Sequence, residues 1–158
     1  MAVLAFAAHA SATIWTFNDP ITAIQEVIPN ASHGLGSIIG TYDDVSKILS
    51  HTTTFSGLVA GTSAAHFHGP ALPGVNASVQ IGLAGFPVGV TSGVYSNSHA
   101  LTALQETQFL GGLWYVNIHT TFSPGGEIRG QLNPVPGPAT AALLALGGVM
   151  AMRRRRTV

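Results

Sequence analysis

Three histidines in this chain are spaced so that they could share one metal ion. His66 and His68 flank Phe67, and in an extended strand the side chains of residues i and i+2 share a face, about 7 Å apart at their Cα atoms. A third histidine, His119, lies in a second segment with the alternation typical of a strand. Three imidazoles on neighbouring strands suit copper or zinc. The spacing therefore makes His66, His68 and His119 a candidate copper or zinc site, as a hypothesis beside a structural role.

Other polar residues follow the same alternation. Asn117 shares the face of His119, and Glu127 and Arg129 share one face of the last predicted strand. If these strands are neighbours, we expect the three histidines and these residues to form one polar patch outside the apolar core. His51, on a further predicted strand, could add a fourth ligand.

A purely structural role explains the same histidines. Each imidazole would then be satisfied by ordinary hydrogen bonds, and Glu127 and Arg129 would form cross-strand pairs that contribute about 0.2 to 1 kcal/mol. The two interpretations differ in whether an ion is bound.

The motifs of several enzyme classes are missing from the sequence. It has no cysteine, which excludes disulfides, thiolate metal sites and a cysteine nucleophile. It also has no Gly-x-Ser-x-Gly elbow, no His-Glu-x-x-His helix and no phosphate-binding loop. We therefore predict no catalytic function.

The charges are unevenly distributed although the formal net charge is zero. Four of the six basic residues are consecutive arginines near the C-terminus, and only Lys47 and Arg129 precede them. The six acidic residues all lie in the body of the chain. A nucleic-acid surface needs several basic residues on one face. Nucleic acid is therefore not predicted as a partner.

The composition favours short strands joined by tight turns. Only 8% of the residues are charged, and 19 are glycine. We predict an all-β fold, an antiparallel β-sandwich or flattened Greek-key barrel of seven or eight strands with at most one short helix, at 98–106. The candidate strands are 13–17, 35–42, 48–58, 64–68, 77–83, 90–96, 113–120 and 127–132.

The apolar start of the chain has the character of an export signal. Residues 1–12 include Ala8-His9-Ala10 and Ala10-Ser11-Ala12, whose small-x-small form signal peptidase accepts. The segment is short and lacks a basic beginning, so we interpret it as a signal peptide, possibly truncated at its start. An ordinary first strand is the alternative.

Two segments resemble the signature segments of the CHRD family, a domain type first described in chordin. The first is His66-Phe67-His68-Gly69-Pro70-Ala71, and the second spans 115–132 and ends in Gly-Glu-Ile-Arg-Gly-Gln-Leu. The resemblance implies one CHRD domain over 13–132 in an extracellular setting. It names a module without assigning it an activity.

The last segment, 133–158, resembles a PEP-CTERM sorting signal, a bacterial tag that consists of a proline motif, an apolar helix and a basic stop. Gly137 stands where the signal has Glu, which leaves cleavage open. As a helix, 139–152 would span roughly 21 Å at about 1.5 Å per residue, short for a bilayer core of about 30 Å. A buried helix with a basic tail is the alternative. The residues of the signal are Pro136, Gly137 and Pro138, the run 139–152, and Arg153, Arg154, Arg155 and Arg156.

The histidines resemble part of the copper site of the copper-zinc superoxide dismutases. The likeness covers the three histidines, the turn Gly125-Gly126 and Arg129. The bridging histidine loop, the zinc ligands and the disulfide cysteines of those enzymes are absent. Superoxide dismutation is therefore not predicted.

Two functional hypotheses remain. The first is an exported bacterial cell-surface or extracellular-matrix CHRD module with a non-catalytic binding or structural role. Its expected partners are extracellular polysaccharide or a surface protein, an exosortase-type sorting enzyme, and the membrane through the C-terminal helix before processing. The link to polysaccharide comes from the resemblance to PEP-CTERM proteins. The alternative is a copper or zinc protein that uses His66, His68 and His119.

Overall fold

The computed structural model describes residues 13–138. The predicted signal segment 1–12 and the apolar run and arginines of the sorting segment lie outside the described residues. The elements in chain order are β1 (Ile14–Thr22), the 3-10 turn η1 (Ala23–Gln25), β2 (Leu35–Asp43), β3 (Ile48–Ser56), β4 (Thr62–His68), β5 (Val79–Gly82), β6 (Gly93–Ala100), α1 (Ala103–Leu110), β7 (Tyr115–Thr120), β8 (Ile128–Gln131) and β9 (Val135–Pro136).

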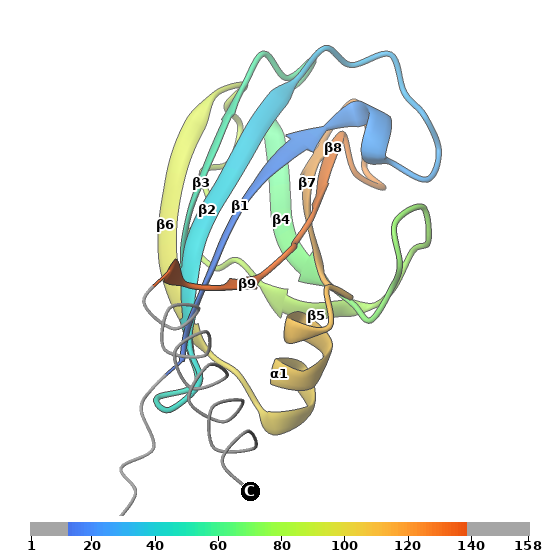
Figure 1. Ribbon diagram of the computed structural model, residues 1–158. Helices are drawn as coiled ribbons and strands as arrows, with labels where there is room; N and C mark the ends of the chain where they lie inside the picture. The colour runs from blue at the N-terminus through green and yellow to red at the C-terminus, as the bar shows by residue number, and fades with distance from the viewer. Residues whose placement is uncertain (1–12, 139–158) are drawn as a thin grey trace, which may run out of the picture.

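The strands form one antiparallel sheet that curls into a half-barrel (Figure 1). Its order is β5-β4-β7-β8-β1-β2-β3-β6, and β9 pairs with the free stretch of β1. The two halves of the sheet meet where β8 joins β1, at the single pair Thr22 and Arg129. The all-β prediction is confirmed, and the architecture within the described part is one curled sheet of nine strands.

The apolar core fills the inside of the curl because strand alternation turns one side chain in two inward. From one half of the sheet come residues such as Ile38 and Leu49, and from the other come Phe67 and Val116, all fully buried. Helix α1 lies below the curl in Figure 1 and inserts Phe109, which packs edge-on against Phe17 and Tyr42 at 5.6 Å.

All eight predicted strand segments contain strands, but the helix begins later than predicted. The sequence placed it at 98–106 with a serine cap, whereas β6 continues to Ala100 through pairing with β3. The helix starts at Ala103 because Thr102 and Gln105 form a reciprocal capping box, in which each side chain bonds the other's backbone N–H.

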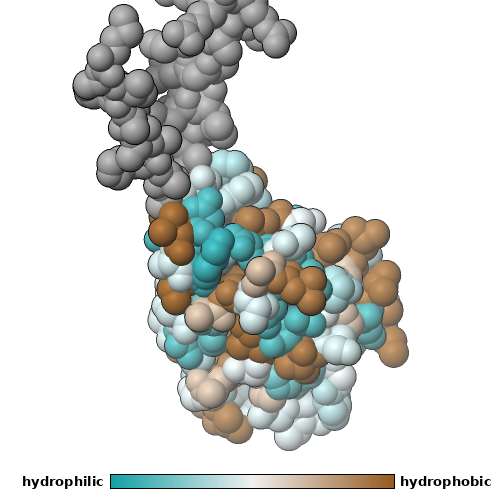
Figure 2. Space-filling model, turned by 90° about the horizontal axis from the view of Figure 1, so that it is seen from below, coloured by the Kyte–Doolittle hydropathy of each residue, from teal (hydrophilic) through white to brown (hydrophobic). Residues whose placement is uncertain are grey.

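The surface at the α1 end mixes polar and apolar residues. Figure 2, seen from this end, shows several separate apolar patches divided by polar ones. Exposed apolar side chains such as Val45 and Leu104 contribute to the apolar surface of the molecule. Within residues 13–138 there is no helix with the length and apolarity needed to cross a membrane.

We predict that Phe109→Ala destabilises the domain by about 3 to 5 kcal/mol, since it removes the aromatic side chain that fills the end of the core. Chemical denaturation of the full chain would measure this loss. Leu104→Ala, on the same helix but 67% exposed, is the matched control and should change the free energy of unfolding by less than about 1 kcal/mol. Equal losses in both variants would contradict the plugging role of Phe109.

Candidate metal centre

The three predicted ligands lie together on the face of the sheet that points away from the apolar core. His66 and His68 come from β4 and His119 from the neighbouring β7, where Ala64 pairs with His119. Their candidate ligand atoms all lie within 4.8 Å of one another. Nδ1 of His66 and Nε2 of His119 are 3.0 Å apart. The pairing of two strands thus gathers three imidazoles at one point.

Backbone carbonyls set the tautomers of two of these rings. Nδ1 of His68 is 2.9 Å from the carbonyl oxygen of Ala77, and Nδ1 of His119 is 2.9 Å from that of Pro124. A carbonyl only accepts, so both Nδ1 atoms carry hydrogen and each Nε2 keeps a lone pair. This is the arrangement by which proteins orient metal-binding histidines. Nε2 of His68 is buried and has no hydrogen-bond partner.

The third ring, His66, completes the cluster. Because Nε2 of His119 holds a lone pair, Nδ1 of His66 donates to it across the 3.0 Å separation. A metal ion would replace this shared hydrogen, with the His66 proton moved to its other nitrogen. Two ligands on a tetrahedral ion with bonds of about 2.0 Å lie roughly 3.3 Å apart. Small shifts of side chains would therefore suffice to close the set around one ion.

The cluster is held in its neutral form. Burial lowers the pKa of His66, His68 and His119, and for His119 the charges of the other two add to this effect. The hydrogen bonds to Ala77 and Pro124 act in the opposite direction and are smaller. Neutral imidazole is the form that binds metal. The site is therefore ready for an ion at neutral pH without first losing protons to solvent.

A layer of polar side chains continues from the cluster across β7 and β8. The ring of His68 stacks on Tyr115 at 5.0 Å and 7°. The guanidinium carbon of Arg129 lies 3.4 Å from the centroid of the same Tyr115 ring. Segments between the strands cover this layer. Asn76 accepts a hydrogen bond from the guanidinium of Arg129, and Gln25 accepts one from the backbone N–H of Gln131. The patch predicted outside the apolar core is therefore a buried polar layer, with Asn117 only 2% and Arg129 only 1% exposed.

Glu127 does not belong to this layer, and its predicted place in the patch was wrong. Its carboxylate accepts hydrogen bonds from the hydroxyls of Ser32 and Thr120 and from the backbone N–H of Val59. Gly126 precedes it with a φ of 134°, a conformation outside the range of a regular strand. The turn changes the direction of the Glu127 side chain, so the alternation of side chains along β8 does not extend back to this residue.

Glu26, which the sequence analysis did not single out, enters the layer from the loop after β1. Its Oε1 and the Oδ1 of Asn117 are both buried without a hydrogen-bond partner. Both flank Gly126, where an added Cβ would come within 2.3 Å of Asn117 and 2.6 Å of Glu26. Burial raises the pKa of Glu26 to about 7, against the lowering effects of Arg129 and Asn117. No spacing in the sequence signals this contact.

Comparison with known families agrees with the two signature segments. The sequence profile of the CHRD domain matches residues 17–132, which is most of the chain. The chain belongs to the CHRD domain family. No curated protein and no solved structure shows significant similarity to it. The matched range of the CHRD domain includes most of β1, all of β2 to β8, and all three clustered histidines.

His51 lies on the other side of the CHRD domain sheet, so its predicted role as a fourth ligand was wrong. Its ring packs 5.0 Å from Phe67, the residue between His66 and His68 that points into the core. It also stacks on His99 at 5.6 Å, because β3 pairs with β6. Burial lowers the pKa of His51 to about 4, and the nearby His99 adds to the shift. Both rings therefore belong to the interior.

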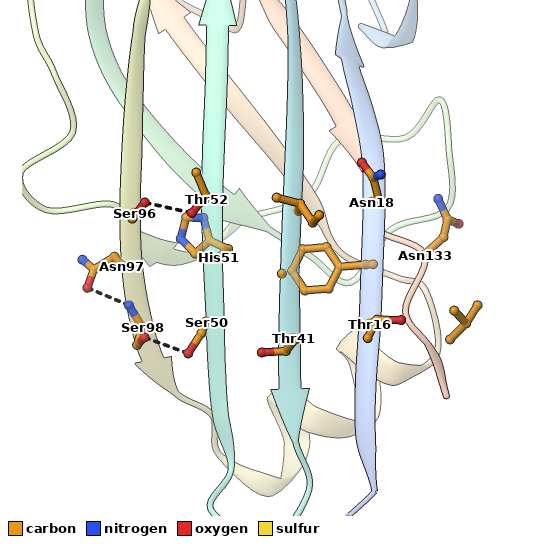
Figure 3. Close-up of a pocket in the computed structure, with 14 residues that line it drawn as sticks. Thr16, Asn18, Thr41, Ser50, His51, Thr52, Ser96, Asn97, Ser98 and Asn133 are labelled. Atoms are coloured by element: carbon orange, nitrogen blue, oxygen red, sulfur yellow. Dashed lines mark hydrogen bonds between the residues drawn. The ribbon is translucent and has the colours of Figure 1, made fainter. Parts of the chain in front are cut away.

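A groove of about 1080 Å³ lies away from the histidine cluster, on the outer face of β1, β2, β3 and β6. Hydroxyl and amide side chains from these strands line it in rows (Figure 3), with Thr52 bonded to Ser96 and Ser50 to Ser98, each at 2.8 Å. No Asp, Glu, Lys or Arg lines it, and the ring of His51, which is part of the lining, packs in the core against Phe67. It has room for a ligand, and its lining contains no cluster of metal-binding groups.

We predict that Glu26→Gln stabilises the domain relative to the wild type as the pH rises from 4.5 to about 7. At Glu26 the folded state binds more protons than the unfolded chain in this window, because the folded carboxyl has the raised pKa, so the contribution of this group to stability falls as the pH increases. The variant lacks this titration. Thermal unfolding of both proteins across the window measures the difference, in which His51 and all other shared groups cancel. Parallel curves would contradict the raised pKa.

Proposed function

We propose that this CHRD domain binds one transition-metal ion, copper or zinc, through His66, His68 and His119, in a non-catalytic role. The observation that carries the proposal is the state of two rings. His68 and His119 each donate Nδ1–H to a backbone carbonyl, which leaves each Nε2 with a lone pair, and both rings belong to the cluster whose candidate ligand atoms lie within 4.8 Å of one another. A structural role leaves the buried, unpaired Nε2 of His68 without an explanation, whereas a metal ion would use it.

The chemistry of the donor set supports copper or zinc. All three ligands are neutral imidazoles, and imidazole suits zinc, copper, iron and nickel better than it suits magnesium or calcium, which prefer oxygen. Burial favours the neutral rings that these metals require. We assign no reaction to the ion, and its proposed role is metal holding or metal-dependent binding.

We predict that the full-length protein retains about one copper or zinc ion per chain after dialysis, as measured by elemental analysis. Replacement of His66 or His119 by Ala should abolish retention, since two imidazoles cannot close the set. His33→Ala is the matched control, because His33 is exposed and is not part of the cluster, and it should retain the ion. If the folded wild type retains neither copper nor zinc, the metal-binding proposal is wrong and the histidines are structural residues.

We further propose that the protein is an exported bacterial surface or extracellular-matrix component that associates with polysaccharide. The signal-like start and the sorting-like tail support export, and an exosortase-type enzyme would be the one to act on that tail. The groove supports the choice of ligand, because a neutral surface rich in hydroxyl and amide groups suits a neutral polyhydroxylated chain. Part of the proposed sorting segment is held by the fold, since β9 (Val135–Pro136) pairs with β1 and the backbone N–H of Gly137 donates to the carbonyl oxygen of Ile14 at 2.7 Å. A sorting enzyme would have to release this strand first.

We predict that the wild type accumulates in the matrix fraction of a producing bacterium and that Ser96→Trp, which fills the groove, shifts it to the free fraction. Ser63→Trp is the control, since Ser63 is equally exposed but lies on β4, away from the groove. Immunoblots of the fractions give the distribution. Wild-type protein confined to the cytoplasm would refute export, and equal retention of both variants would refute the groove as the polysaccharide site.

A further inference from the structure

A buried positive charge lies beside the proposed metal site. Arg129 is 1% exposed, and its guanidinium carbon is 3.4 Å from the centroid of the Tyr115 ring. The ring of His68 stacks on the same Tyr115 at 5.0 Å. Because the strands run in the order β4-β7-β8, Tyr115 separates the imidazole of His68 from the guanidinium of Arg129. The Tyr115 ring thus lies between His68, a proposed metal ligand, and the positive charge of Arg129.

The charge of Arg129 has little local compensation. Its hydrogen bonds go to two neutral amide oxygens, those of Asn76 at 3.5 Å and Gln131 at 3.4 Å. Over residues 13–138, the ion pair within 4 Å is Lys47 with Glu106, so Arg129 has no carboxylate partner at that distance. Glu26 attracts Arg129 from the loop, but its raised pKa leaves that carboxyl partly protonated at neutral pH.

The ligand set itself brings no negative charge. Its three members are neutral imidazoles, and the sequence contains no cysteine to supply a thiolate. An ion bound here would keep its full charge close to Arg129, because none of its three ligands would offset that charge.

We propose that the site selects monovalent copper over divalent ions. The repulsion from Arg129 is twice as large for Zn²⁺ or Cu²⁺ as for Cu⁺, and partial burial weakens the screening by water. Coordination number acts in the same direction, since three imidazoles complete a trigonal set for Cu⁺, whereas Zn²⁺ held by three histidines needs water as a fourth ligand. The inference rests on the proposed metal-binding function and adds the charge of the ion and the residue that determines it.

The test compares three ions on the full-length chain, with Cu⁺ under anaerobic reducing conditions and Cu²⁺ and Zn²⁺ in air, each in competition with a chromogenic chelator. We expect Cu⁺ to be retained at chelator concentrations that remove both divalent ions. Arg129→Gln should strengthen Zn²⁺ binding relative to Cu⁺ by on the order of tenfold. Arg129→Lys, which keeps a positive charge at this position, should preserve the preference for Cu⁺.

The outcomes separate the two proposals. Retention of none of the three ions would overturn the metal-binding function itself. Binding of Zn²⁺ or Cu²⁺ as tightly as Cu⁺ would leave that function standing and overturn the selectivity. A preference for Cu⁺ that Arg129→Gln leaves unchanged would overturn the role of Arg129. Should that variant fail to fold, the comparison of Cu⁺ with Cu²⁺ on the wild type still decides the selectivity.

Discussion

Burial of β7 on both faces is the constraint on which the rest of this domain depends. All six residues of Tyr115–Thr120 are buried, although their side chains alternate between two environments. Val116 and Ile118 point into the apolar core, whereas Tyr115 and His119 point into the polar layer. A strand with only one covered face would leave the polar side chains in water. Here the loops cover the second face of β7, so these polar side chains form a buried layer.

The covering loops also provide the hydrogen-bond partners that a buried polar layer needs. The carbonyl of Ala77, in the loop after β4, holds His68, and that of Pro124, in the turn after β7, holds His119. Removal of water lowers the pKa of both rings, and the carbonyls decide which nitrogen stays free. The strands therefore supply the imidazoles, and the loops determine how two of the rings are oriented and which ring nitrogen carries the hydrogen.

Ionic charge is scarce in this protein, so each buried charge has a large effect. Arg129 and Glu26 lie in the same polar layer, and burial is the main cause of the shifted pKa of both. The hydroxyl-lined groove has no charge at all. At the end of the described chain, Gly137 is buried against Ile14, and a Cβ there would come within 2.8 Å of the carbonyl oxygen. This contact leaves no room for a side chain at position 137.

Alternation along single strands determined much of this protein from the sequence alone, namely the all-β class, the eight main strand segments, and the shared face of His66 and His68. Period-two alternation is a local property, because each Cβ points opposite to its neighbour. The tertiary structure decided which strands are neighbours and which face is covered. The pairing of β3 with β6 places His51 in the core, and the turn at Gly126 changes the direction of the Glu127 side chain. The loop after β1 places Glu26 beside Gly126 in the polar layer. These contacts arise from closure of the curl and from loop paths, for which spacing along the chain carries no signal.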